Sequence, residues 1–157
     1  MALIQHYADI ELSELLALAQ EKHEQKYRFV QMLCVTTDNG VDALYSFMKG
    51  NDIENYTIKD IDTETVTVPS ISHLFLAAFP FENEAHDLFG LQITDMVIDF
   101  MGDFYMVAMD KPMTVISPEL RAAKLKAAKI AQAKAAKEAK AKKEALAAQQ
   151  STEKVGE

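Results

Sequence analysis

The chain of 157 residues is 49% hydrophobic and has a formal net charge of −8, which is typical of one globular domain with an appendage. Its one cysteine, Cys34, excludes an intrachain disulfide and an iron–sulfur cluster held by this chain alone, and its five scattered glycines exclude the familiar phosphate-binding motifs. No apolar run reaches about 18 residues, which excludes a transmembrane helix, and residues 1–6 lack the features of a signal peptide, so we expect a cytoplasmic protein.

The charge is divided unequally along the chain. Residues 1–116 contain six Lys/Arg and nineteen Asp/Glu, a balance of −13, whereas residues 117–157 contain ten Lys/Arg and five Asp/Glu, a balance of +5. We therefore expect an acidic domain over 1–116 and a basic extension over 117–157. The acidic domain would repel phosphates, which excludes nucleic acid as a partner.

Residues 10–26 predict the first element, a packing helix. Their apolar side chains recur at helical spacing, and Asp9 or Ser13 would cap its start. The face that we expect to be buried consists of Leu12, Leu15, Leu16, Ala19 and His23.

Residues 27–36 are β-branched, aromatic and apolar on both faces, which predicts a central strand. Cys34, in its second half, is expected to be a small buried hydrophobe rather than a reactive thiol. The pair Asn39-Gly40 then predicts an antiparallel hairpin to a strand at 41–48. The side of this strand that we expect to face the core consists of Val41, Ala43, Tyr45 and Phe47.

Two weaker strands are predicted next, at 55–61 and 65–68. Pro69 ends the second of them, because proline has no N–H for the ladder. A helix followed by mainly antiparallel strands is an α+β pattern. We therefore predict an N-terminal helix and a mainly antiparallel mixed sheet of three to five strands, followed by a short docking helix and a long C-terminal extension.

The short helix is predicted at residues 80–89, where both boundaries are marked. Pro80 suits the first helical position, and Gly90 suits the left-handed position just past the end. The apolar face consists of Phe81, Ala85, Leu88 and Phe89. The opposite, largely acidic face consists of Glu82, Asn83, His86 and Asp87, with Glu84 in the first turn. Because so short a helix is unstable alone, it must dock on other structure.

The remaining residues leave alternatives open. Residues 102–109 form either a last strand or an extended arm on a partner, and Met101, Met106 and Met109 serve either core filling or an adaptable contact surface. Ser117-Pro118 is a helix start, and the Ala/Lys-rich sequence that follows predicts a helix over 118–150. That helix is either solvated or a tether along a partner or an anionic membrane.

Three stretches together resemble a known family. They are Tyr27-Arg28-Phe29-Val30-Gln31, Val68-Pro69-Ser70-Ile71-Ser72, and Glu82-Asn83-Glu84-Ala85-His86-Asp87-Leu88-Phe89-Gly90-Leu91. They are similar to the 30-kDa-type subunit of respiratory complex I, whose homologues occur in membrane-bound energy-converting [NiFe] hydrogenases of the Ech and formate hydrogenlyase type. The family hallmark is Glu-Arg-Glu, two residues and Asp-Leu-Phe-Gly, preceded by Val-Pro-Ser, and the resemblance covers roughly residues 10–109.

The resemblance implies an α+β subunit without cofactors or an active site of its own. The [NiFe] centre and iron–sulfur clusters would lie in partner subunits, a catalytic large subunit and a cluster-bearing small subunit, with the membrane arm contacted indirectly. The chain would lie on the inner face of the cell membrane. On this basis the residues expected to dock on the large subunit are Glu82, Asn83, Glu84, His86 and Asp87, and the structural anchors are Phe81, Leu88, Phe89 and Gly90.

Departures from the family pattern point to the hydrogenase branch. Asn83 replaces the usual arginine, and Gly102 is followed by Asp103-Phe104-Tyr105 rather than by the basic Gly-His-Pro-Asp-Leu-Arg-Arg segment. The alternatives are a subunit of an NADH–quinone oxidoreductase proper and a free-standing adaptor. The carboxylates of the short helix do not favour a metal site or an acid–base pair, because His73 is the only other candidate ligand nearby and no nucleophile accompanies them.

Overall fold

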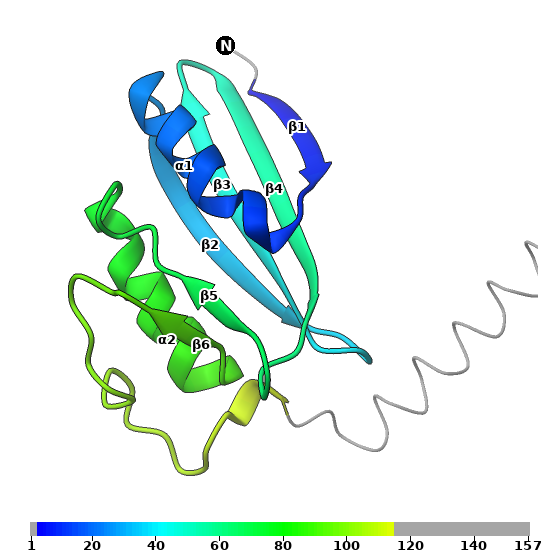
Figure 1. The fold of residues 1–157 in the computed structure, drawn as a ribbon, viewed down its shortest axis with the longest axis vertical. Helices are drawn as coiled ribbons and strands as arrows, with labels where there is room; N and C mark the ends of the chain where they lie inside the picture. Colours follow the sequence, from blue (N-terminus) through cyan, green and yellow to red (C-terminus); the bar gives the residue numbers. More distant parts are fainter. Residues whose placement is uncertain (1–2, 115–157) are drawn as a thin grey trace, which may run out of the picture. The chain divides into compact units, whose positions relative to one another are not determined.

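The main sheet of the fold is four-stranded and mixed, with the strand order β1-β4-β3-β2 (Figure 1). The computed structural model describes residues 3–114, so the predicted extension over 117–157 and its helix over 118–150 lie outside the described residues. The strands are β1 (Ile4–Asp9), β2 (Arg28–Thr36), β3 (Val41–Lys49) and β4 (Asp52–Ile61). The pairs β2–β3 and β3–β4 are antiparallel, and β1 is parallel to β4. The predicted α+β class and its main hairpin are confirmed.

The chain begins with a strand rather than with a helix, which corrects the predicted element order. β1 precedes the 3-10 turn η1 (Leu12–Glu14) and the helix α1 (Leu15–Glu24). All six residues of β1 are exposed, so the strand lacks the alternation that marks a half-buried strand. Its parallel pairing with β4 joins segments 48 residues apart, Ile4 with Asp52, and no local sequence signal reports such a contact.

β2 lies at the sheet edge, so the prediction of a central strand is wrong. Its apolar residues on one face, including Cys34, are buried, whereas Leu33 and Val35 on the other face are 48% and 50% exposed. Burial raises the pKa of the Cys34 thiol to about 12, which agrees with a packing role. The predicted inward residues of β3 are confirmed as the centre of the core: Val41, Ala43, Tyr45 and Phe47.

Helix α1 lies across one face of the sheet (Figure 1), and Leu15 and Ala19 are fully buried beneath it. Leu16, predicted to be inside, is 47% exposed. The helix start also differs from the prediction. Instead of Asp9 or Ser13, Glu14 caps the start: its carboxylate accepts the backbone N–H of Glu11 at 2.8 Å, and its own N–H donates to Glu11 O at 3.0 Å.

A partly buried ion pair joins α1 to the sheet. Lys22 is only 5% exposed, and its Nζ lies 2.6 Å from a carboxylate oxygen of Glu54 on β4. The hydroxyls of Tyr27 and Tyr56 donate to the same carboxylate at 2.8 Å and 2.6 Å. Burial acts to raise the pKa of Glu54, but these donors outweigh it and lower that pKa to about 2.

The second half of the domain is a β–α–β unit. Strand β5 (Thr67–Pro69) is parallel to β6 (Gln92–Thr94), and between them lie the 3-10 turn η2 (Leu76–Ala78) and the helix α2 (Phe79–Phe89). The predicted helix boundaries are confirmed: a proline occupies its first turn, and Gly90 caps its end with φ 72°. Gly90 N–H donates to His86 O at 3.0 Å, which is the bond of an αL cap, and Leu91 N–H donates to Ala85 O at 3.2 Å.

Residues 95–110, which we call the arm, follow β6 without a strand, so of the two alternatives for 102–109 the last strand is wrong, and contact with a partner stays a prediction. The short turn η3 (Pro112–Thr114) ends the described chain. Within the described residues, no helix is long and apolar enough to cross a membrane.

Candidate functional site

The acidic block on α2 begins with Glu82, which is only 1% exposed. Its carboxylate accepts the hydroxyl of Ser70 at 2.7 Å and the backbone N–H of Ile71 at 2.8 Å. Burial raises the pKa of Glu82, and these two bonds act against that rise. The Val-Pro-Ser segment and the α2 block, far apart in sequence, therefore meet at this carboxylate.

Asn83 is also 1% exposed, and its amide is fully bonded. The NH2 group donates to Phe79 O at 2.7 Å and to Ile98 O at 2.9 Å, and the amide oxygen accepts Phe100 N–H at 2.9 Å. One side chain thereby bonds to a carbonyl of the helix and to two peptide groups of the arm. An arginine, which has no acceptor, would lack the bond to Phe100 N–H.

Asp87 extends the same pattern by one turn. It is 6% exposed, and one of its oxygens accepts the backbone N–H of Tyr105 at 2.9 Å. The other oxygen lies 3.0 Å from Nδ1 of His86. In the 70–72 loop, the hydroxyl of Ser72 accepts Val97 N–H at 3.0 Å. The arm is thus held to α2 and the 70–72 loop at four backbone positions.

Glu84 and His86 are the members of the block that stay partly exposed. The hydroxyl of Tyr105 donates to Glu84 at 3.0 Å, and this bond raises the pKa of Tyr105. The structure therefore corrects the idea of one outward acidic face, because Glu82, Asn83 and Asp87 point into the domain. Helix periodicity assigned one face of α2 to the core, but the arm covers much of the other face.

The predicted anchors divide similarly. Phe81 packs against the core, with its ring 5.8 Å from that of Phe29 in an edge-to-face arrangement, and Phe89 also borders the core. Leu88 is half-buried. Gly90 is buried and has a left-handed φ, and an added Cβ would lie 2.4 Å from a side-chain carbon of Lys111, so a larger residue would also have to displace that side chain.

Sequence reasoning missed the groups that receive the buried block. Ser70 and Ser72 are buried, and their hydroxyls lie 2.6 Å apart beside Glu82. The Ser-Ile-Ser sequence after Pro69 is a signal that would have identified them, because two serine hydroxyls on either side of one residue can gather around a single carboxylate. Tyr105 gives no such signal, since its role depends on how the arm folds back.

The buried polar groups of this region are hydrogen-bonded within the domain. Every buried side-chain nitrogen and oxygen in the described residues has a hydrogen-bond partner, so the polar groups around α2 are engaged with one another. Among residues 3–114, no group of three or more His, Cys, Asp and Glu side chains is arranged to hold a metal ion.

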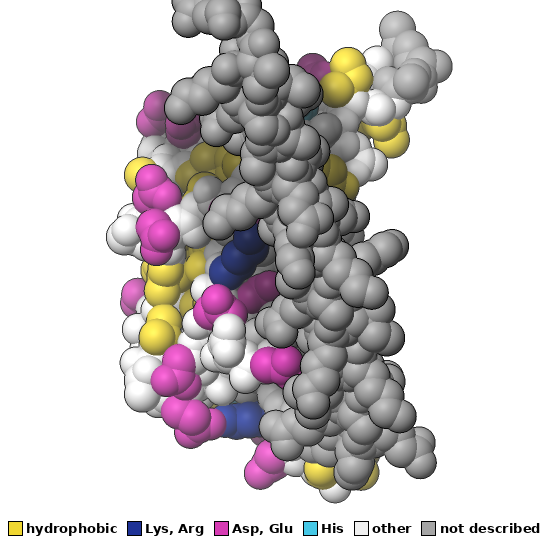
Figure 2. Space-filling view, turned by 90° about the vertical axis from the view of Figure 1, so that its right-hand side faces the viewer, with side chains coloured by type: hydrophobic (Ala, Val, Ile, Leu, Met, Phe, Trp, Pro, Cys, Tyr) yellow, Lys and Arg dark blue, Asp and Glu magenta, His cyan; other side chains and the backbone are white. Residues whose placement is uncertain are grey.

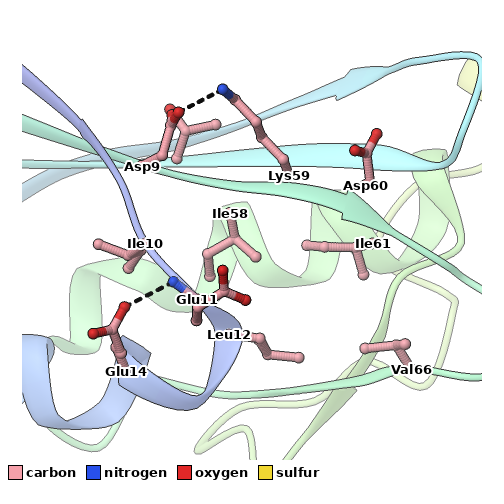
Figure 3. Close-up of a pocket in the computed structure, with 11 residues that line it drawn as sticks. Asp9, Ile10, Glu11, Leu12, Glu14, Ile58, Lys59, Asp60, Ile61 and Val66 are labelled. Atoms are coloured by element: carbon pink, nitrogen blue, oxygen red, sulfur yellow. Dashed lines mark hydrogen bonds and ion pairs between the residues drawn. The ribbon is translucent and has the colours of Figure 1, made fainter.

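A separate pocket of about 660 Å³ lies between η1 and the end of β4. The aliphatic side chains of Ile58 and Ile61 face Leu12 and Val66 across it (Figure 3). Two of its charged side chains have partners at the rim: Lys59 Nζ lies 2.5 Å from a carboxylate oxygen of Asp9, and Glu14 accepts the N–H of Glu11. None of the lining residues belongs to α2 or the arm.

Most of the described chain matches one known protein family. Residues 7–97 match the family described as respiratory-chain NADH dehydrogenase, 30 Kd subunit. The chain belongs to this family. The matched residues include the Val-Pro-Ser segment and all of α2, and the match ends at Val97, just where the arm becomes the outer cover of α2. No curated protein matches the chain.

The family fold is also found in a solved structure. A chain of the membrane-bound sulfane sulfur reductase, an archaeal respiratory membrane complex, is similar with a TM-score of 0.60 at 13% sequence identity. The likeness covers 69% of this chain and 66% of that chain, just under two thirds of its length. At this identity the likeness concerns the fold.

Proposed function

We propose that this chain is a noncatalytic assembly subunit in the cytoplasmic arm of a complex I-like, membrane-bound oxidoreductase. It docks on the catalytic large subunit beside a cluster-bearing small subunit, and the membrane arm is contacted indirectly. The observation that carries this proposal is membership of the 30 Kd subunit family over residues 7–97. The similarity to a chain of an archaeal respiratory membrane complex adds support at the level of fold.

Within that class we propose an energy-converting [NiFe] hydrogenase, with the [NiFe] centre and iron–sulfur clusters in the partner subunits. Two sequence features support this choice: Asn83 stands in place of the family arginine, and Asp103-Phe104-Tyr105 stands where the basic segment of a quinone-reducing complex would follow Gly102. Asn83 fits its place because it holds the arm at Ile98 and Phe100. The competing function is a subunit of an NADH–quinone oxidoreductase proper.

Docking involves the α2 block in two ways. Glu84 and His86, which are partly exposed, contact the large subunit directly, whereas Glu82, Asn83 and Asp87 act by fixing the surface around them. Basic groups on the partner suit this domain, because residues 1–116 carry a balance of −13. Figure 2 shows acidic side chains spread over the visible part of one face, with few Lys and Arg among them.

Affinity purification tests the proposal. The full chain, tagged at its chromosomal locus, is isolated from detergent-solubilised membranes, and its companions are identified by mass spectrometry and metal analysis. We expect a [NiFe] large subunit, a cluster-bearing small subunit, nickel and iron. Isolation with an NADH-oxidising module and quinone reductase activity would instead favour the NADH–quinone oxidoreductase. Recovery of the chain without any oxidoreductase subunit would favour a free-standing adaptor.

A further inference from the structure

The arm concentrates exposed apolar side chains. Eight large hydrophobic residues between positions 97 and 109 are exposed, half of the sixteen found among the described residues. Met101 is 85% exposed, and Met106 is fully exposed. Patches of this kind on a folded domain mark interaction surfaces, and methionine adapts well to irregular partners.

The backbone of the arm is held at residues between 97 and 105, although most of its side chains are exposed. Asn83 and Asp87 bond to Ile98, Phe100 and Tyr105 from beneath. The aromatic rings of Phe100, Phe104 and Tyr105 form a row, with centroids 5.1 Å and 5.0 Å apart along it. Because the backbone is ordered before binding, less conformational entropy is lost on contact with a partner.

We propose that the arm is a preformed docking strip for a partner protein. The surface of the partner that it contacts is apolar at its centre and is bordered by the partner's lysine and arginine side chains. This inference rests on the proposed function, since the partner is the catalytic large subunit. It deepens that function by naming the chemistry of the contact and assigning Asn83 and Asp87 as positioning residues. Most of the arm lies beyond Val97, where the family match ends.

Charge decides between the possible occupants of the strip. Four exposed aspartates lie along the arm, and no Lys or Arg occurs between positions 60 and 110. The aspartates are Asp95, Asp99, Asp103 and Asp110. An anionic membrane surface would repel them, and a second copy of the chain would place aspartates against aspartates. A protein surface with basic side chains around an apolar centre complements both features.

A pair of lysine substitutions distinguishes these occupants, because added positive charge should weaken binding to a basic protein surface and strengthen binding to an anionic membrane. The double variant Met101→Lys/Met106→Lys removes two apolar contacts and adds positive charge at two exposed positions. The control is Leu16→Lys on α1, where the replaced side chain is 47% exposed. Circular dichroism and thermal unfolding of each purified full chain verify that all three proteins fold alike.

Each tagged full chain is isolated from membranes, and the large subunit is quantified relative to it by mass spectrometry. We expect equal yields with wild type and Leu16→Lys, and a loss of at least about tenfold with the double variant. An undiminished yield with the double variant would overturn the inference while leaving the proposed function intact. Absence of the large subunit from the wild-type preparation would overturn both.

Two further measurements test the rejected occupants. Sedimentation with vesicles of phosphatidylcholine and phosphatidylglycerol tests the membrane, and light scattering of the full chain tests self-association. On our inference the wild type neither sediments with vesicles nor self-associates through the arm. Vesicle binding that the lysine variant strengthens, or a wild-type dimer that it alters, would overturn the inference.

Discussion

Glu82, Asn83 and Asp87 are polar side chains with almost no exposure, and each is matched to particular groups of its own chain. Glu82 bonds to the 70–72 loop, Asn83 and Asp87 to the arm. Removing such a group leaves its partner buried without a hydrogen bond, which costs more than the bond itself contributes. These residues therefore stabilise the domain before any partner arrives.

Substitution of neighbouring glutamates on α2 separates folding from docking. We expect Glu82→Ala to lower the free energy of unfolding by about 3 kcal/mol, because it leaves Ile71 N–H unpaired and opens a cavity. Glu84→Ala should change it by less than about 0.5 kcal/mol, because that side chain is partly solvated. Urea unfolding of the full chain measures both values. Equal losses would contradict the assignment of Glu82 to the interior and Glu84 to the surface.

The partly buried ion pair between α1 and β4 gives a prediction about pH. The pKa of Glu54 is lowered from 4.5 to about 2, so its stabilising contribution is complete above pH 4.5 and is lost as the pH falls towards 2. We expect the stability advantage of wild type over Glu54→Gln to shrink across this range. It is measured by urea unfolding at several pH values.

Glu82 provides a control of opposite sign for the pH series. Burial raises its pKa, so its contribution is complete below its ordinary pKa and is lost as the pH rises through the folded value. The difference between wild type and Glu82→Gln should therefore favour wild type most at low pH. Parallel pH profiles for the two variants would contradict the opposite pKa shifts.

Among the secondary-structure elements, those with local signals could be predicted from sequence. The Asn39-Gly40 turn and the alternation of 41–48 identify the hairpin, and Pro80 and Gly90 bound α2. The edge position of β2 could not be predicted, because it depends on β1 joining the sheet at β4 rather than at β2. The docking residues were predicted by resemblance and remain a prediction. The inward direction of Glu82, Asn83 and Asp87 could not be predicted, since the arm that covers them has no periodic pattern.

Gly90, at the end of α2, lies against the side chain of Lys111, just beyond the arm. A second glycine, Gly50, serves as a control. Both Gly90 and Gly50 have left-handed φ values, 72° and 62°, but a Cβ at Gly50 would meet nothing within 4 Å. Gly50→Ala should therefore cost about 1 kcal/mol from backbone strain alone. Gly90→Ala should cost about 2 kcal/mol, because it also displaces Lys111 from its ion pair with Glu64, 2.9 Å apart. Equal losses in urea unfolding would show that Lys111 adapts freely.

Across the whole molecule, the acidic charge and the exposed apolar arm have different roles in association. A charge balance of −13 over residues 1–116 acts at long range and accelerates encounter with a basic surface, but dissolved salt screens it. The apolar side chains of the arm act only at contact and determine how long the complex lasts. The two contributions can therefore be separated by kinetics.

Binding kinetics with the purified complex lacking this subunit distinguish the two roles. For wild type, raising NaCl from about 50 mM to about 500 mM should slow association strongly and change dissociation little, because screening acts on the encounter. Glu84→Gln removes one partly exposed charge, so it should weaken the salt dependence of association while leaving dissociation nearly unchanged. Met106→Ala removes contact area without charge, so it should raise the dissociation rate several-fold at every salt concentration and leave association unchanged. If Met106→Ala altered only association, the methionine would act in encounter rather than in the bound complex, and the arm could not be the strip that holds the partner.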